Sequence, residues 1–136
     1  MDIAGFSFMV SQLDGYRFIE SRFPSSFDQQ RLWAAAASYP MLWEEKVATV
    51  TLNDVSEMGD LAGEAPTVLA WVLRQNQLRA QIVATSWVVG ANRRAGEQIR
   101  EVLLAVGRPT DTIFETRDEA IAFLRARIRA FREEPN

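Results

Sequence analysis

Residues 47–73 have the sequence VATVTLNDVSEMGDLAGEAPTVLAWVL, which predicts a strand, a polar loop and a helix in succession. Residues 47–53 are β-branched or apolar at most positions, a pattern typical of a strand that is covered on both faces of a parallel sheet. In open α/β sheets, binding sites form in the crevice beyond the carboxyl ends of the strands. We therefore expect a binding surface in the loop that follows, lined by Asp54, Ser56, Glu57, Met58, Gly59, Asp60 and Gly63.

The composition limits both the size of the protein and its chemistry. With 136 residues, of which 48% are hydrophobic, the chain suits a single domain that buries about two thirds of its unfolded surface. There is no cysteine and no histidine, which excludes disulfides, thiolate or imidazole metal sites, cysteine nucleophiles and Ser-His-Asp triads. Any catalysis would depend on carboxylates, hydroxyls, arginines or the one lysine, Lys46.

Charge is distributed unevenly along the chain. The net charge is −3, yet residues 1–68 hold 4 basic and 10 acidic side chains, and residues 69–136 hold 11 basic and 8 acidic ones. This polarity can orient a partner or a second copy of the chain, although an unevenly charged, solvated surface explains it more simply. The basic side chains are too sparse to predict nucleic-acid binding.

The first residues, Met1-Asp2-Ile3, lack the basic start and apolar run of a signal peptide. No stretch of about 18 apolar residues is present to span a membrane. We therefore expect a soluble, cytoplasmic protein that is not transmembrane.

The first quarter of the chain predicts a hairpin followed by a helix. Residues 6–11 alternate with the period of a strand, Asp14-Gly15 is a favoured two-residue turn, and a second strand extends over residues 16–23. The adjacent Phe18 and Ile19 indicate either a bulge or burial on both faces. Three features then describe the first helix: a capping box of Ser26 and Gln29, apolar residues at helical spacing, and a kink near Tyr39 caused by Pro40.

After the central strand and loop, helices and strands alternate. We expect a helix from Pro66 to about Asn76, a strand over residues 79–85, and a strand-to-helix junction at Ser86-Trp87. A further helix, a short strand and a last helix are predicted by a terminator at Gly107, the apolar run 112–114 and a capping box of Thr116 and Glu119. A leading hairpin followed by alternating helices and strands predicts one α/β domain over residues 1–136, with a mixed sheet of about five strands.

In this element order, two segments resemble the STAS or SpoIIAA-like family. They are residues 55–63, VSEMGDLAG, and residues 113–124, IFETRDEAIAFL, and the resemblance extends over nearly the whole chain. Its most typical part is the closing segment, in which an apolar strand and a short polar turn precede a helix with an acidic residue, alanine, an aromatic residue and leucine. The resemblance implies non-enzymatic work: regulation through protein partners or, in some relatives, binding of a small or lipid-like ligand.

The resemblance also implies a regulatory serine that this chain lacks. Antagonists of anti-sigma factors in this family carry a phosphorylatable serine at the junction after the central strand. A helix amino terminus there presents free amides and the positive end of the helix dipole, so an added phosphate changes both the local charge and the fit to a partner. Here the residues between Met58 and Gly63 include no hydroxyl, and Ser56 and Thr67 are offset from that position. We therefore do not expect the family's phosphorylation switch. Asp60 offers a fixed negative charge, although complementing a helix dipole explains it more simply.

Two charged groups are candidates for chemistry or anion binding. The carboxylates of Asp54, Glu57, Asp60 and Glu64 have the ligand type for a hard divalent ion or an acid and base pair, but an exposed acidic loop is the simpler interpretation. Arg93 and Arg94 lie near a helix start and are candidates for an anionic ligand or lipid head group. A surface helix turn explains them as well.

The combined prediction is a binding domain without catalytic residues, cofactor or metal. Its surface for another protein, or for a second copy, is expected to include residues 56–63 and the Ser86-Trp87 junction, with Trp87 as anchor because tryptophan is enriched in interface hot spots. The alternative is an apolar or lipid-like ligand in a pocket between sheet and helices, formed by Trp33, Met41 and Trp43. For Trp33 and Trp43 core packing is the favoured interpretation, and a partner surface is the alternative.

Overall fold

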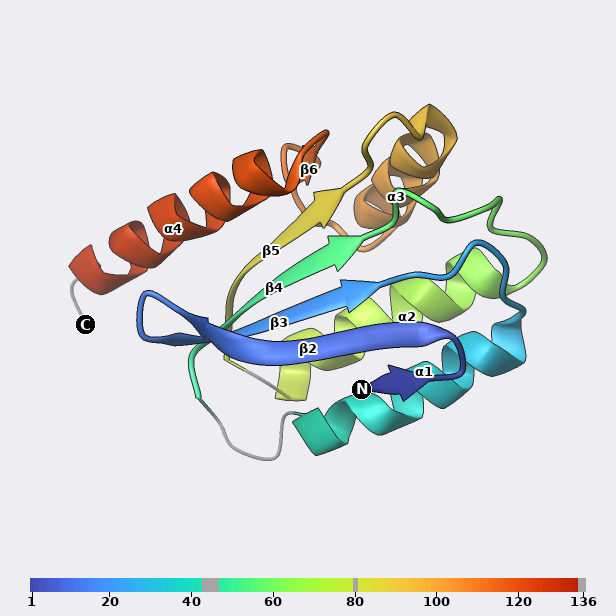
Figure 1. The fold of residues 1–136 in the computed structure, drawn as a ribbon, viewed down its shortest axis with the longest axis horizontal. Coiled ribbons are helices and arrows are strands. Elements are labelled where there is room, and N and C mark those ends of the chain that lie inside the picture. The colour runs from blue at the N-terminus through green and yellow to red at the C-terminus, as the bar shows by residue number, and fades with distance from the viewer. Residues whose placement is uncertain (43–46, 80, 135–136) are drawn as a thin grey trace.

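Six strands form one mixed sheet in which the order along the chain is also the order in space (Figure 1). The computed structural model describes residues 1–42, 47–79 and 81–134. Strands pair antiparallel up to β3 and parallel from β3 onward. Their bounds are β1 (Asp2–Ile3), β2 (Phe6–Leu13), β3 (Tyr16–Arg22), β4 (Thr49–Asp54), β5 (Ile82–Val88) and β6 (Ile113–Phe114). The predicted α/β domain with a mixed sheet is confirmed, with six strands instead of about five because β1 was not predicted.

Four helices cover the two faces of the sheet unequally. They are α1 (Gln29–Leu42), α2 (Ala65–Arg79), α3 (Arg93–Ala105) and α4 (Arg117–Glu133). When parallel strands are added to a sheet in one direction through right-handed crossovers, all the connecting helices lie on the same face of the sheet. Accordingly, α1, α2 and α3 share one core, and α4, which follows the last strand, packs on the other face. Figure 1 shows α1 and α2 beneath the sheet and α4 alongside β5 and β6.

Each face of the sheet has its own hydrophobic core. Under α1–α3 the core is partly aromatic, and the ring of Phe23 makes edge-to-face contacts with Phe6 at 5.0 Å and Trp87 at 6.2 Å. Under α4 it is mainly aliphatic, with Leu124 and Ile128 fully buried. β4 lies between the two cores and is buried along almost its whole length, as its sequence predicts.

The predicted hairpin between β2 and β3 is confirmed. Asp14 and Gly15 both have positive φ, 50° and 83°, which a two-residue turn between twisted strands requires. The β2–β3 register is continuous, and Phe18 and Ile19 are both buried, so burial on both faces explains their adjacency. An irregularity occurs instead in the β4–β5 pairing, next to Thr49.

The first helix differs from the prediction at its start and is not split at Pro40. α1 begins at Gln29, and the carboxylate of Asp28 accepts a hydrogen bond from the Arg31 amide at 2.8 Å. Asp28 therefore takes the capping role that was predicted for Ser26. The helix continues through Pro40 to Leu42 and does not end there.

In the second half of the chain, the boundaries of α2 and β5 are shifted, and two predicted helix signals are confirmed. α2 continues past Asn76 to Arg79, and β5 begins at Ile82, so the predicted junction at Ser86-Trp87 lies inside a strand. Ala80, part of the predicted strand, lies outside the described residues. The capping box of Thr116 and Glu119 at the start of α4 is confirmed, and Gly107 follows α3 with φ 70°. In the described parts of the chain, the helices lack the length and apolar character needed to cross a membrane.

Candidate functional site

The loop after β4 is fixed in place by Asn92, the residue that caps α3. Its side-chain oxygen accepts a hydrogen bond from the Ala95 amide at 3.1 Å. Its side-chain nitrogen donates to the backbone oxygens of Ser56 at 3.1 Å and Met58 at 2.8 Å. One amide group therefore completes the helix amino terminus and ties the loop to it.

Further contacts hold the rest of this loop. The side chain of Gln98 exchanges two hydrogen bonds with the backbone of Leu61, at 3.0 and 3.3 Å. The amide of Gly59 donates to the backbone oxygen of Ser25 at 2.9 Å, and a Cβ at position 59 would lie only 2.6 Å from that oxygen. The loop is thus docked against α3 and against the connection between β3 and α1.

The predicted site residues divide into exposed and buried groups. Asp60 and Gly63 are exposed, while Ser56 is half-buried and donates its hydroxyl to Asp54 at 2.6 Å. Three residues predicted to form the surface are instead in the interior: Met58, Ser86 and Trp87. Trp87 is 1% exposed and belongs to the core, so it does not serve as a surface anchor on this structure.

Two of the charged candidates, Asp60 and Arg94, pair with each other. Arg94 lies 3.3 Å from the carboxylate of Asp60 and 3.7 Å from Glu97, whereas Arg93 is exposed. Within the described residues, no group of three or more acidic side chains is placed to hold a metal ion.

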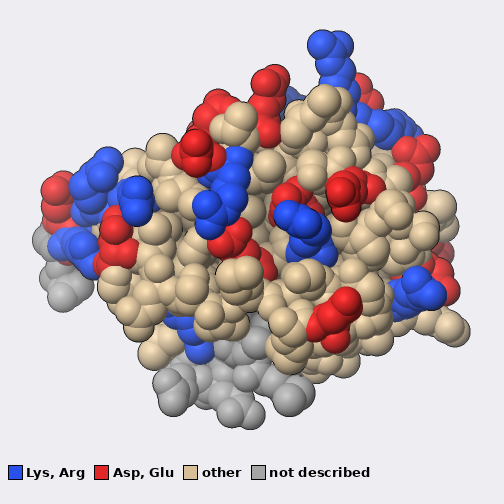
Figure 2. All heavy atoms as spheres, in the orientation of Figure 1, with Lys and Arg blue, Asp and Glu red and all other residues tan. Residues whose placement is uncertain are grey.

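Acidic and basic side chains are interspersed on the face shown in Figure 2. One pair joins β3 to α4: Arg117 donates two hydrogen bonds to Glu20, at 2.7 and 3.0 Å. Donating these hydrogen bonds to Glu20 raises the pKa of Arg117 above its ordinary value. A second pair, Arg22 and Asp54, lies 3.8 Å apart near the carboxyl end of the sheet.

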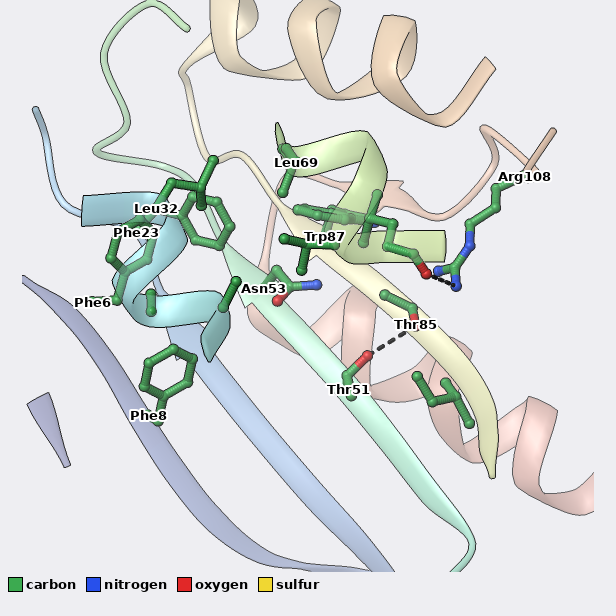
Figure 3. A pocket seen from close by; sticks show the side chains of 15 residues that line it. Phe6, Phe8, Phe23, Leu32, Thr51, Asn53, Leu69, Thr85, Trp87 and Arg108 are labelled. Atoms are coloured by element: carbon green, nitrogen blue, oxygen red, sulfur yellow. Dashed lines mark hydrogen bonds between the residues drawn. The ribbon is translucent and has the colours of Figure 1, made fainter. Parts of the chain in front are cut away.

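An interior cavity of about 40 Å³ lies between the sheet and the helices α1 and α2 (Figure 3). At about 10–15 Å³ for each molecule, it has room for about three waters. Most of its wall is apolar, and a smaller polar part includes Asn53 and the hydrogen-bonded pair of Thr51 and Thr85, 2.9 Å apart. Trp87 also lines the cavity, and its buried indole nitrogen has no hydrogen-bond partner among the residues that the structure describes, although buried donors are normally satisfied.

Arg108 stands at the border of this cavity, where Figure 3 shows its guanidinium beside the polar part. It donates to the backbone oxygen of Leu73 at 3.2 Å. Burial lowers the pKa of Arg108, because desolvation disfavours the charged form.

Two tryptophans form an exposed pair on the outside of the helical layer. The rings of Trp33 on α1 and Trp71 on α2 lie 4.8 Å apart, and the residues are 42% and 43% exposed. The predicted core position of Trp33 is therefore wrong. The side chain of Met41 and residue Trp43, which were expected to join it in a pocket, lie outside the described residues.

Next to this pair, a hollow of about 380 Å³ lies between α2 and α3. Trp71 forms part of its wall, and Leu61 from the loop after β4 forms another part. Its other lining residues are Pro66, Thr67, Ala70, Arg74, Gln98, Glu101, Val102 and Ala105. The tryptophan pair and the hollow together make up what we call the helical surface.

The roles of Trp71 and Arg108 were not predicted. Trp71 lies outside the buried stripe of Val68, Leu69, Val72 and Leu73, so helical spacing is a signal that could have placed it on the exposed face of α2. Arg108 is one of several arginines near a helix end. Scans against family models and curated proteins found no match to the chain.

Proposed function

We propose that this chain is a non-enzymatic binding domain that recognises another protein through the helical surface. The observation that carries the proposal is the contact between two exposed tryptophans, Trp33 and Trp71, beside a hollow with a largely apolar wall. Tryptophan is the residue type most enriched among the residues that dominate protein interfaces. A monomer gains little from exposing two of them together, whereas a partner would bury both at once.

The loop after β4 contributes to this surface in a different way from the one predicted. Leu61 reaches the hollow, and Gln98 and Asn92 hold the loop against α3. A rigid loop loses less conformational entropy on binding than a mobile one. The hollow between two helices has the form of site that accepts apolar side chains from an amphipathic partner helix.

The family resemblance supports the same class of function. We propose a SpoIIAA-like protein that acts through protein contacts without the family's phosphorylatable serine. The resembling segments correspond to the loop after β4 and to β6 with α4. That loop carries the carboxylate of Asp60, which pairs with Arg94. Unlike the charge of a phosphate group, the charge of this side chain does not depend on a modification.

Site-specific photo-cross-linking in the source cells tests the proposal. A benzophenone amino acid is placed at Thr67, which is exposed and lines the hollow, and at Leu104, an exposed apolar position on α3 outside the hollow. We expect protein adducts from position 67 only, and their loss when Trp33 and Trp71 are both replaced by alanine. An adduct of twice the chain mass would identify a second copy as the partner.

Two results would contradict the proposal. One is the absence of any protein adduct at position 67, and the other is an adduct that persists at full yield in the double tryptophan variant. Circular dichroism must show that the double variant remains folded. Trp33 and Trp71 are only 42% and 43% exposed, so their truncation removes buried area and should lower stability, and adduct yields are compared at a temperature at which both proteins are folded.

The unpaired indole nitrogen of Trp87 favours a second candidate, a small-molecule site in the interior cavity. We propose a ligand with one hydrogen-bond acceptor, which would satisfy this donor while its apolar part contacts Phe6, Phe23 and Leu32. The volume of about 40 Å³ requires the helices to move apart for anything larger than a few waters. Nothing as long as a lipid chain fits the cavity as it stands.

Thermal unfolding with 1-butanol and with pentane as added probes tests this second candidate. A ligand that binds the folded state raises the melting temperature with its concentration. We expect a larger rise with butanol than with pentane, and loss of that difference in Trp87→Phe, which keeps a ring but removes the donor. Equal shifts with both probes would argue against an acceptor site.

A further inference from the structure

The outer edge of β5 is only partly covered by a neighbouring strand. β6 pairs with Trp87 and Val88 alone. The backbone bonds at this junction include those from the Trp87 amide to Thr112 and from the Val89 amide to Phe114, both 2.9 Å. In the described parts of the chain, residues 82–86 therefore have a strand partner only on the β4 side.

A groove of about 550 Å³ follows this open edge. Its floor includes residues 82–85, which are half-buried rather than covered. One wall comes from the connection between α3 and β6, with Pro109 and Thr112, and the other from α4, with Phe123. Figure 1 shows α4 alongside β5 on this side of the sheet.

The backbone of an open strand edge is itself a recognition element. It presents amide and carbonyl groups at the spacing of an extended chain, which a further strand satisfies. Natural proteins protect such edges with lysine, proline, an inward-pointing charge, a bulge or a covering helix or loop. The floor residues Ile82, Val83, Ala84 and Thr85 carry no charge and no proline, and the β4–β5 register shifts between Ile82 and Ala84. The regular part of the open edge, residues 84–86, gives about 10 Å of pairing length.

The shape of the groove favours a single extended segment over a second copy of this domain. The edge is recessed between two walls, so two such edges cannot meet without a clash between their walls. A lone peptide strand has no walls of its own and fits between them. It would lie beside residues 82–86, in line with β6 along the same edge of β5.

The charged residues that line the groove indicate which kind of side chain a bound peptide segment would carry. Arg108 and Arg127 line it, against one acidic residue, Asp111. Arg127 is exposed on α4, while Arg108 is desolvated, which lowers its pKa. An acidic side chain in the groove would stabilise both guanidinium groups.

We propose that this groove binds an extended acidic peptide segment of a protein partner, which adds to the open edge of β5 as a further strand. The site is separate from the helical surface, and none of the residues that line the two is shared. It is therefore a second contact point, and the proposal does not depend on the tryptophan pair.

Selection from a random heptapeptide display library against the full chain tests this inference. We expect enrichment of peptides with alternating β-branched residues, at least one Asp or Glu, and no central proline. An enriched peptide should bind Arg127→Glu about tenfold more weakly. It should bind Arg129→Glu within about twofold of the unchanged protein, because Arg129 is also exposed on α4 but does not line the groove.

Backbone methylation separates strand addition from simple charge attraction. In a paired edge strand every second amide points at its neighbour, so methylating one amide nitrogen should abolish binding and methylating the next should leave it intact. Three results would overturn the proposal: no enrichment, equal binding to Arg127→Glu, or equal tolerance of methylation at both positions. The double alanine variant of Trp33 and Trp71 should bind the peptide normally, so failure of one proposal is distinguishable from failure of the other.

Discussion

Replacing Asn92 should destabilise the protein by an amount that its three hydrogen bonds define. Asn92→Ala removes the helix cap, worth about 1 kcal/mol, and two bonds to loop carbonyls, each worth about 1 kcal/mol. We therefore expect a loss of about 3 kcal/mol in the free energy of unfolding. With a denaturant slope of about 2 kcal/mol per molar, the urea midpoint would fall by about 1.5 M.

Asn92→Ser is the matched control, because serine can still cap α3 but is too short to reach the two loop carbonyls. Its loss should be smaller by about 1 kcal/mol, the contribution of the cap. Hydrogen exchange at the Gly59 amide should accelerate in both variants, since the loop that carries it loses its clamp. If Asn92→Ala costs less than about 1 kcal/mol, the loop does not depend on this residue and the reasoning is refuted.

Three further substitutions test other parts of the structure. Leu124→Ala should cost about 2–5 kcal/mol in urea unfolding, because this side chain of α4 is fully buried against the sheet, and a cost below about 1 kcal/mol would contradict that packing. Gly59→Ala should lower stability by about 1–3 kcal/mol, seen as a lower melting temperature, since its Cβ would lie 2.6 Å from a backbone oxygen; an unchanged melting temperature would contradict this. A double-mutant cycle on Glu20 and Arg117 should give a coupling energy below about 1 kcal/mol that decreases in 1 M salt, because the pair is partly exposed to solvent. A large coupling energy that does not change with salt would contradict this expectation.

Local signals in the sequence predicted most of the secondary structure. The Asp14-Gly15 turn and the capping box of Thr116 and Glu119 depend on contacts between neighbours in the chain, and both are confirmed. The β5 boundary was missed because it depends on distant residues. Ser86 suggested a helix start, but in the fold its hydroxyl donates to the backbone of Thr51 at 3.4 Å, which makes it acceptable inside a buried strand.

The candidate site was only partly predictable for a related reason. Polar residues after β4 marked the loop that α3 holds, but a tryptophan in a strand looks the same whether it is buried or exposed. Trp87 was expected at the surface and lies in the core, and Trp33 was expected in the core and lies at the surface. The choice depends on which face of each element meets a neighbour, and this follows from tertiary packing alone. The open edge of β5 likewise depends on the shortness of β6.

The position of α4 has a consequence for how the protein folds. Residues 1–114 contain all six strands and the three helices of one face, yet they leave the opposite face, with Phe18, Val50 and Leu52, without its covering helix. A folding chain in which α4 has not yet docked exposes this apolar face. During that interval the exposed surface makes the chain prone to aggregation. α4 ends the interval by reaching back across the sheet to the β2–β3 turn, where Arg125 lies 3.5 Å from Asp14.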